Sequence, residues 1–183
     1  MDRIAYAVSA SSLGAVMVAC SARGLCAVLM GDDEKALERL LRDRFPRAQL
    51  AAGGVDVERV ATEVAALVEA PGGEVSVPLD VSGTEFQRAV WAALREIPAG
   101  ETASYAEIAA RIGRPRSVRA VGAACGANAL ALVIPCHRVV RSDGGLSGFL
   151  WGVERKRRLL MMEGALRARA AQAATSPLPD MDG

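Results

Sequence analysis

Short apolar runs separated by polar turns open the chain. The first three runs predict antiparallel strands and are Ile4–Ala10, Gly14–Ser21 and Gly24–Gly31. Two helical patterns follow, the first capped by Asp32-Asp33 and ended by Pro46. Their inward positions are Leu37, Leu41 and Phe45, then Val57, Val60, Val64 and Leu67. Strict alternation over residues 75–81 then predicts a half-buried strand. This part of the chain has no evident catalytic cluster, and we expect a supporting α/β domain over residues 1–81.

Helical patterns dominate from Thr84 onward. Thr84-Glu85-Phe86-Gln87 and Ser104-Tyr105-Ala106-Glu107 are capping boxes, each of which predicts the start of a helix. Pro115 suits the first position of a third helix, which runs to about Gly126. Two short helices about one turn apart are typical of a helix-turn-helix, although many helical hairpins share the pattern.

The last predicted elements are a strand over Leu130–Ile134, a turn at residues 142–145 and a helix over Val153–Gly164. Residues 169–183 are rich in Ala, Pro, Ser and Asp and are expected to be a disordered tail. The pattern therefore predicts an α+β protein in which a mainly helical second domain, residues 82–168, follows the N-terminal domain.

Charge is distributed unevenly along the chain. The overall net charge is +1, but residues 1–83 carry −4, residues 84–170 carry +7 and residues 171–183 carry −2. Thirteen of the 14 cations in the basic segment are Arg, the side chain best suited to bidentate phosphate contacts. A solvated basic face would have the same net charge, but the Arg content favours a nucleic-acid partner.

Composition excludes several classes of protein. The charge-free stretch over residues 120–136 is too short to span a bilayer, and Met1-Asp2-Arg3 does not resemble a signal peptide. Four cysteines without a C-x-x-C pair, and a single His, cannot form the usual Cys/His zinc sets. We therefore expect a cytoplasmic protein without metal or cofactor and with reduced thiols, a Cys20–Cys26 disulfide being the alternative.

Cys136 is the candidate nucleophile. It stands beside the only histidine, His137, and a cysteine with a free pKa of about 8.5 needs such help to react near neutral pH. Neighbouring residues of an extended strand point to opposite faces, so a bridging water or a bend after Pro135 is needed to connect the pair. Glu163 or Glu154 would orient the imidazole. The competing interpretation is a buried structural cysteine.

The segment Ile134-Pro135-Cys136-His137-Arg138-Val139-Val140 resembles, at every position, the active-site motif of the O6-alkylguanine-DNA alkyltransferases. The resemblance is strong over about residues 82–165, where 102–112 and 118–128 match the family's helix-turn-helix. Residues 4–81 are more loosely similar to the corresponding domain of the bacterial adaptive-response repair protein. The family implies a ribonuclease H-like N-terminal domain, a winged helix-turn-helix domain, and transfer of an alkyl group from guanine O6 or thymine O4 to the protein's own cysteine.

The resemblance also implies residue roles. Cys136 would accept the alkyl group, His137 would act as base through a water, Glu163 would hold the imidazole, and Asn128 would brace the adjoining turn. Arg119 would replace the flipped guanine in the duplex, Tyr105 would bind guanine N3 and the neighbouring phosphate, and Ser147 would meet O6. The remaining expected DNA or base contacts are the Val139 carbonyl, Arg116, Arg138 and Trp151.

The implied partner is duplex DNA containing O6-alkylguanine, bound through its minor groove by a monomer. Flipping the base is physically necessary because O6 lies inside the stacked duplex. Three other functions remain open at this point: a lesion-binding protein without transfer activity, a winged-helix regulator that uses Cys136 as a sensor, and a cysteine hydrolase. A hydrolase would turn over, whereas a thioether formed on Cys136 would consume the protein.

Overall fold

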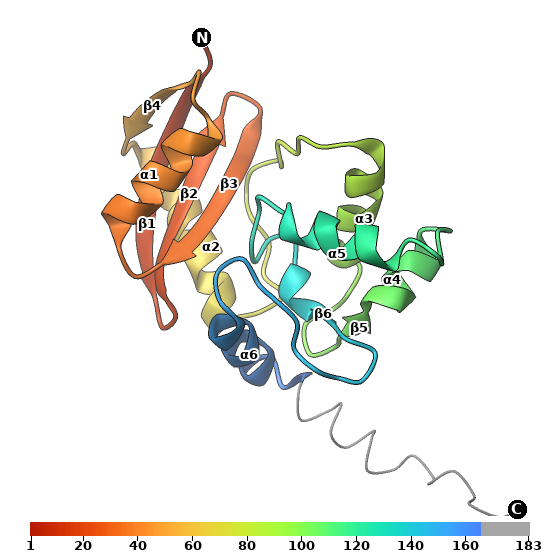
Figure 1. Cartoon of the computed structure of the whole chain (residues 1–183). Coiled ribbons are helices and arrows are strands. Elements are labelled where there is room, and N and C mark those ends of the chain that lie inside the picture. Colours follow the sequence, from red (N-terminus) through yellow and green to blue (C-terminus); the bar gives the residue numbers. More distant parts are fainter. Residues whose placement is uncertain (166–183) are drawn as a thin grey trace, which may run out of the picture.

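A four-stranded sheet forms the N-terminal half of the computed structural model, which describes residues 1–165 (Figure 1). Its strands are β1 (Arg3–Ser11), β2 (Gly14–Ser21), β3 (Gly24–Gly31) and β4 (Gln49–Ala52), in the order β3-β2-β1-β4. β1 and β2 pair antiparallel, as do β2 and β3, which confirms the three predicted strands. β4 pairs parallel to β1 and was not predicted, because its four residues carry no clear alternation.

Two helices cover opposite faces of this sheet (Figure 1). α1 (Glu34–Arg44) packs Leu37 and Leu41 on the face that presents Met17, while α2 (Val55–Glu69) packs on the face that presents Val16. Consecutive strand residues thus enter different cores, as the period of two requires. The N-cap of α1 is Asp33, whose carboxylate accepts from the Lys35 amide, as its position in the sequence suggests.

The predicted strand over residues 75–81 is wrong. The segment bends at residues 76–77 and, among the described residues, joins the sheet through a single bridge at Leu79, where Leu25 N donates to Pro78 O and Asp80 N donates to Leu25 O. Pro78 lacks an amide hydrogen, so it limits the ladder that this segment can form.

Both predicted capping boxes are present in the second half. Thr84 caps α3 (Glu85–Arg95) and Ser104 caps α4 (Tyr105–Arg111). In each box the side chain of the cap accepts from the backbone amide three residues later, and the side chain of that residue accepts from the backbone amide of the cap. α5 (Val118–Gly126) begins three residues after Pro115, which lies in a turn rather than at the first helical position. Trp91 Nε1 donates to Ala124 O at 2.8 Å and fixes α3 against α5.

The segment that follows α5 is a series of turns and not the predicted strand over Leu130–Ile134. Only Leu130 forms a bridge, to Val28, and Val28 N donates to Ala129 O at 2.8 Å. β3 is therefore joined to the 75–81 segment at Leu25 and to the segment after α5 at Val28. Within residues 1–165, Leu132 is the sole non-glycine residue with positive φ, 71°, a conformation in which a strand cannot continue.

A short 3-10 helix, η1 (Cys136–Arg138), replaces the extended backbone expected at the candidate nucleophile. It leads into β6 (Val139–Val140), which pairs parallel with β5 (Ala103–Ser104) at the start of α4. α6 (Val153–Met162) closes the described chain. No helix within residues 1–165 is long and apolar enough to cross a bilayer. The predicted tail at 169–183 lies outside the described residues. Arg167 and Arg169, the last two cations of the basic segment, lie outside them as well.

Candidate active site

A cavity of about 520 Å³ opens between α5 and the segment that precedes α6. That volume lies within the range of small-molecule sites. Its lining includes the Cys136 thiol and five other residues singled out from the sequence, namely Tyr105, Arg119, Asn128, Ser147 and Trp151. The structure thus brings together the greater part of the predicted base-contacting set around one sulfur.

Asn128 fixes the turn that carries the thiol. Its Nδ2 donates to Ile134 O at 2.8 Å and its Oδ1 accepts from Leu130 N at 2.9 Å, so both ends of the 130–134 turn are tied to one buried amide. The Cys136 amide donates to Ile134 O at 2.8 Å, and η1 starts directly afterwards. This tight backbone holds Cys136 at the cavity wall and sends His137 in another direction.

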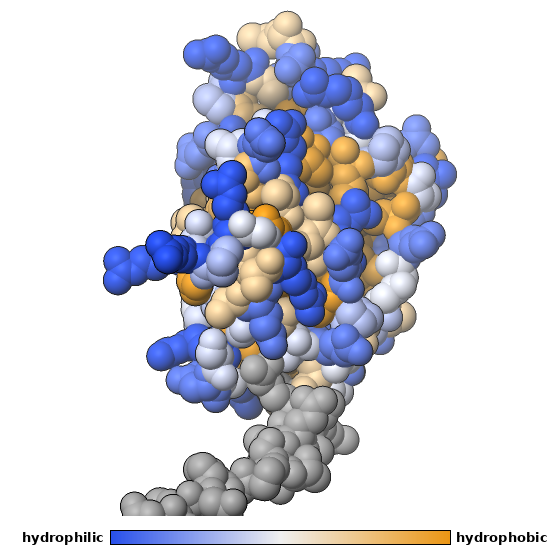
Figure 2. Space-filling view, turned by 90° about the vertical axis from the view of Figure 1, so that its right-hand side faces the viewer, coloured by the Kyte–Doolittle hydropathy of each residue, from blue (hydrophilic) through white to orange (hydrophobic). Residues whose placement is uncertain are grey.

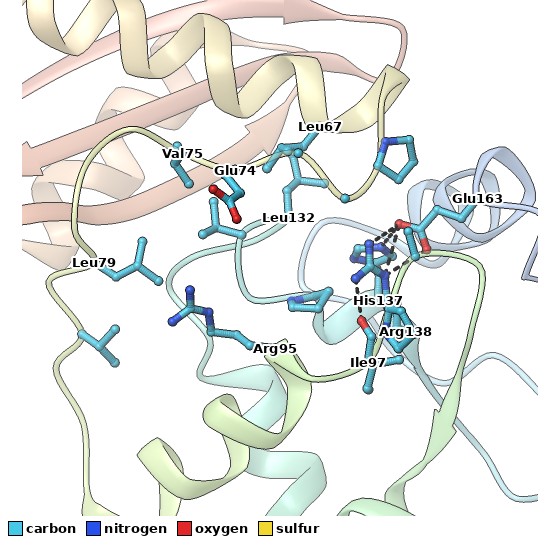
Figure 3. Close-up of a pocket in the computed structure, with 18 of the residues that line it drawn as sticks. Leu67, Glu74, Val75, Leu79, Arg95, Ile97, Leu132, His137, Arg138 and Glu163 are labelled. Carbon is cyan, nitrogen blue, oxygen red and sulfur yellow. Dashed lines mark hydrogen bonds and ion pairs between the residues drawn. The ribbon is translucent and has the colours of Figure 1, made fainter.

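His137 and Glu163 form a hydrogen-bonded pair, as Figure 3 shows. His137 is 1% exposed, and its Nε2 lies 2.8 Å from Glu163 Oε1. Glu163, and not Glu154, is therefore the group that orients the imidazole. Glu154 lies on the exposed face of α6 and pairs with Arg157.

Arg138 completes this buried network. Its Nε and Nη2 donate to the Glu163 carboxylate, Nη2 at 2.9 Å, while Nη1 donates to Ile97 O at 2.7 Å (Figure 3). Burial alone would raise the pKa of Glu163, but hydrogen bonds from His137 and Arg138 hold that pKa at about 2. The Arg138 side chain is thus bonded to Glu163 and to Ile97 O and does not line the Cys136 cavity.

The protonation of His137 follows from these contacts. Burial lowers its pKa, although the Glu163 carboxylate acts in the opposite direction. A neutral imidazole that donates from Nε2 to Glu163 has its lone pair at Nδ1, and this buried atom has no hydrogen-bond partner among the described residues. His137 is therefore set up to accept a proton at Nδ1.

Lys156 is a functional candidate that the sequence did not reveal. It is 1% exposed, its Nζ lies 3.5 Å from Ser147 Oγ, and the same nitrogen lies 5.9 Å from the centroid of the Tyr105 ring. The Tyr105 hydroxyl and Ser147 Oγ are hydrogen-bonded to each other. The one signal in the sequence that could have indicated its burial was its spacing, which places Lys156 on the same face of the helix as the buried Leu159 and Leu160.

The thiol itself is in a largely apolar environment. Burial raises the pKa of Cys136, opposed by a hydrogen bond from Asn128 and by the positive charge of Lys156. Burial also raises the pKa of Cys125, which lines the same cavity, to about 12. Both thiols are protonated near neutral pH in the free protein, so Cys136 needs a base at the moment of reaction.

Glycines on α5 keep the cavity open. Gly122 and Gly126 both line it, and a Cβ added at Gly122 would come within 3.9 Å of the Tyr105 ring. Their spacing of four residues within a predicted helix was a usable signal for a cavity wall, because glycine is otherwise unfavourable there.

The surface of α4 and α5 is basic. Its exposed arginines are Arg111, Arg114, Arg116 and Arg119. Figure 2 views the molecule from this side and shows hydrophilic side chains around hydrophobic ones. Arg119 reaches the cavity, whereas Arg116 lies in the turn before α5 and does not line it.

Val139 was expected at the base and is not among the lining residues. Its side chain is fully buried and its backbone pairs with Ala103 in the β5–β6 ladder. A second and larger cavity, of about 820 Å³, lies on the far side of the His137–Glu163–Arg138 network and does not include the thiol (Figure 3). It is bounded by the loop that follows α2 and by the end of α3.

A cysteine at the wall of a ligand-sized cavity, next to a histidine oriented by a carboxylate, is typical of nucleophilic sites. Residues 85–165 match the family model described as the DNA-binding domain of 6-O-methylguanine DNA methyltransferase. The chain is 42% identical over 149 residues to the inducible methylated-DNA–protein-cysteine methyltransferase of Bacillus subtilis, covering 80% of this chain and 82% of that protein. The chain belongs to the methylated-DNA–protein-cysteine methyltransferase family.

Other relatives extend this finding. The chain is 49% identical over 160 residues to the bifunctional transcriptional activator/DNA repair enzyme Ada of Escherichia coli. That match covers 87% of this chain but only 45% of Ada, so the chain spans about half the length of this relative. The fold is similar to a crystal structure of Mycobacterium tuberculosis OGT in complex with DNA, with a TM-score of 0.72, 35% identity and coverage of 88% of this chain and 94% of that one.

Proposed function

We propose that this protein repairs DNA by direct reversal, moving an alkyl group from O6 of guanine, or O4 of thymine, in duplex DNA onto Cys136. The observation that carries the proposal is the position of Cys136 on the wall of a base-sized cavity, next in the chain to His137, whose buried imidazole is bonded to Glu163. The names of the family's members, methylated-DNA–protein-cysteine methyltransferases, support the same activity.

The transfer is a single displacement. Cys136 Sγ attacks the alkyl carbon, a C–S bond forms, the C–O6 bond breaks, and its electron pair stays on the base. The thiol proton passes through a water to His137 Nδ1, the buried acceptor that Glu163 fixes through Nε2. A proton returns to the departing guanine, so the products are neutral guanine and an S-alkyl cysteine. A thioether offers no route to hydrolysis, and each molecule therefore reacts once.

The base is held by groups that face the sulfur across the cavity. Ser147 meets O6, and Tyr105 donates to N3, which helps to neutralise guanine as a leaving group. Lys156 adds positive charge beside both hydroxyls and the thiol. In a site closed to water, such a charge stabilises developing negative charge far more than it does in bulk solvent. Trp151 forms a side wall.

DNA is bound by α4 and α5, which serve as the helix-turn-helix of a winged domain over residues 82–168. The exposed arginines make phosphate contacts, and α5 enters the minor groove, with Arg119 taking the place of the extruded base. Residues 1–81 form a separate ribonuclease H-like domain, and the protein acts as a monomer. The DNA-bound structure of the M. tuberculosis relative supports DNA as the partner.

Two cysteines in one cavity give this proposal a matched test. Wild-type protein, Cys136→Ala and Cys125→Ala would be incubated with duplex DNA carrying tritiated O6-methylguanine, and label on protein counted. Cys125→Ala should take up label to one equivalent, whereas Cys136→Ala should take up none and still bind the duplex. Uptake by Cys136→Ala, or continued release of methanol beyond one equivalent, would exclude the proposed transfer.

A further inference from the structure

We infer that Arg155 is a positioning residue through which the N-terminal sheet holds the wall of the Cys136 cavity in place. The inference rests on the proposed transfer reaction and gives the N-terminal domain a part in it. Arg155 lies on the first turn of α6, one residue before the buried Lys156, but its side chain extends toward the opposite half of the molecule.

The guanidinium joins three separate pieces of the chain. Nε donates to Leu13 O at 2.8 Å, in the turn between β1 and β2, and Nη2 donates to Asp32 Oδ1 at 2.7 Å, just after β3. Nη1 donates to Trp151 O at 3.0 Å, at the end of the cavity wall. One planar group thus ties the 147–151 segment to both ends of the β2–β3 hairpin.

The sheet is shaped to receive this side chain. A Cβ added at Gly14 would lie 3.2 Å from Arg155 Nη2 and 2.8 Å from Asp32 Oδ1, so a larger residue would crowd the guanidinium. Gly14 also has a φ of 105°, which side-chain-bearing residues rarely adopt. The Arg155 side chain is 21% exposed, so its bonds to Leu13 O and Trp151 O are partly shielded from water, whereas Asp32 is 85% exposed.

The other support for the cavity wall at this end is apolar, because Phe149 and Trp151 pack against the hydrophobic cores. α6 begins after Gly152, which has a φ of 100° and offers no side-chain cap to the helix. Leu150 is 63% exposed, and Trp151 is half-buried between the two hydrophobic cores. Arg155 supplies the polar anchor that the glycine cap does not, and it sets the position of both Trp151 and the adjacent Lys156.

Loss of this anchor should slow the chemical step while leaving DNA binding intact, because the arginines of α4 and α5 are untouched. The test variant is Arg155→Met, which keeps the apolar stem and removes all three donors. Arg157→Met is the matched control, since it removes the same charge from the same helix, and the side-chain partners of Arg157, Glu154 and Met161, are both exposed. Single-turnover methyl transfer from duplex O6-methylguanine DNA would be measured against DNA concentration.

Arg155→Met should lower the limiting transfer rate about tenfold, as expected for losing charge-assisted hydrogen bonds, with the half-saturating DNA concentration unchanged. Reaction of Cys136 with iodoacetamide should stay within about twofold of wild type, because this small reagent needs no positioned wall. A general loosening of the fold would instead change both reactions together. Arg157→Met should match wild type in all three measurements.

Should Arg155→Met fail to fold, Arg155→Lys decides the matter, because lysine keeps the charge but cannot bond three acceptors at once. A folded Lys variant with a reduced limiting rate supports the inference. A wild-type limiting rate in either folded variant overturns it. Absence of transfer by the wild-type protein would instead contradict the proposed function, so the two failures are distinguishable.

Discussion

Replacing Glu163 with Gln removes the only negative charge in the described part of the His137–Glu163–Arg138 network while keeping its shape. The side chain is 3% exposed, and the bonds from His137 Nε2 at 2.8 Å and Arg138 Nη2 at 2.9 Å converge on one oxygen. Lowering the pKa from the ordinary 4.5 to about 2 corresponds to about 3 kcal/mol of folding stability. Leaving a buried Arg138 without its counter-charge costs a similar amount, about 3–5 kcal/mol. We expect Glu163→Gln to lower the free energy of unfolding by about 3 kcal/mol at pH 7.

Urea unfolding as a function of pH tests this value and its cause. A carboxylate whose pKa is lowered by folding contributes its full stability above the unfolded value of 4.5, and this stability is lost as the pH falls toward about 2. The difference between wild type and Glu163→Gln should therefore be constant from pH 7 to 5 and shrink below pH 4.5. Glu154→Gln, on the exposed face of α6, serves as control and should leave the urea midpoint unchanged. A Glu163→Gln effect below about 1 kcal/mol, or one that persists unchanged at pH 2.5, would refute the reasoning.

Three further predictions concern the cavity. Lys156→Met should slow methyl transfer at pH 7.5 about tenfold without loss of stability, because it removes a charge beside the thiol that is itself costly to bury; an unchanged transfer rate would contradict this. Asn128→Ala should lower the free energy of unfolding by about 2 kcal/mol, since it leaves the buried Leu130 N without its partner and removes one of the two hydrogen bonds that Ile134 O accepts, and urea unfolding would detect the loss. Iodoacetamide alkylation of Cys136 without DNA should keep rising above pH 9, because burial raises the pKa of this thiol; a plateau below pH 8 would show an activated thiolate instead.

Local sequence signals predicted the elements whose hydrogen bonds are themselves local. The capping boxes at Thr84 and Ser104 provide hydrogen-bond partners for the first backbone amides of each helix from residues within one turn. These partners can therefore be identified from the sequence. The strand expected at residues 75–81 depended on a long-range partner. Its alternation was real, but beyond Leu25 no ladder partner lies beside it among the described residues. Alternation of apolar and polar residues shows that successive side chains face two different environments. It does not show that the segment is hydrogen-bonded to another strand.

The candidate site shows the same difference between features set by neighbouring residues and features set by long-range contacts. The motif around Cys136 indicated the candidate nucleophile and its neighbouring histidine, but it did not predict the 3-10 helix in which both lie. The family resemblance assigned Arg138 to DNA and gave Lys156 no role, whereas both side chains are buried in polar contacts. Charged residues are almost never buried without a partner. The partner of Arg138 is Glu163, which is distant in the sequence, and the partner of Lys156 is Ser147, which lies in a loop. Sequence reasoning from single positions could not supply those distances.

Intact mass of the protein after incubation with excess duplex DNA carrying O6-methylguanine tests the central claim most directly. The account predicts one added methyl group, about 14 Da, located on Cys136 by peptide mapping and stopping at one per molecule. An unchanged mass with retained binding of the lesion, or a methyl group located on Cys125, would contradict it.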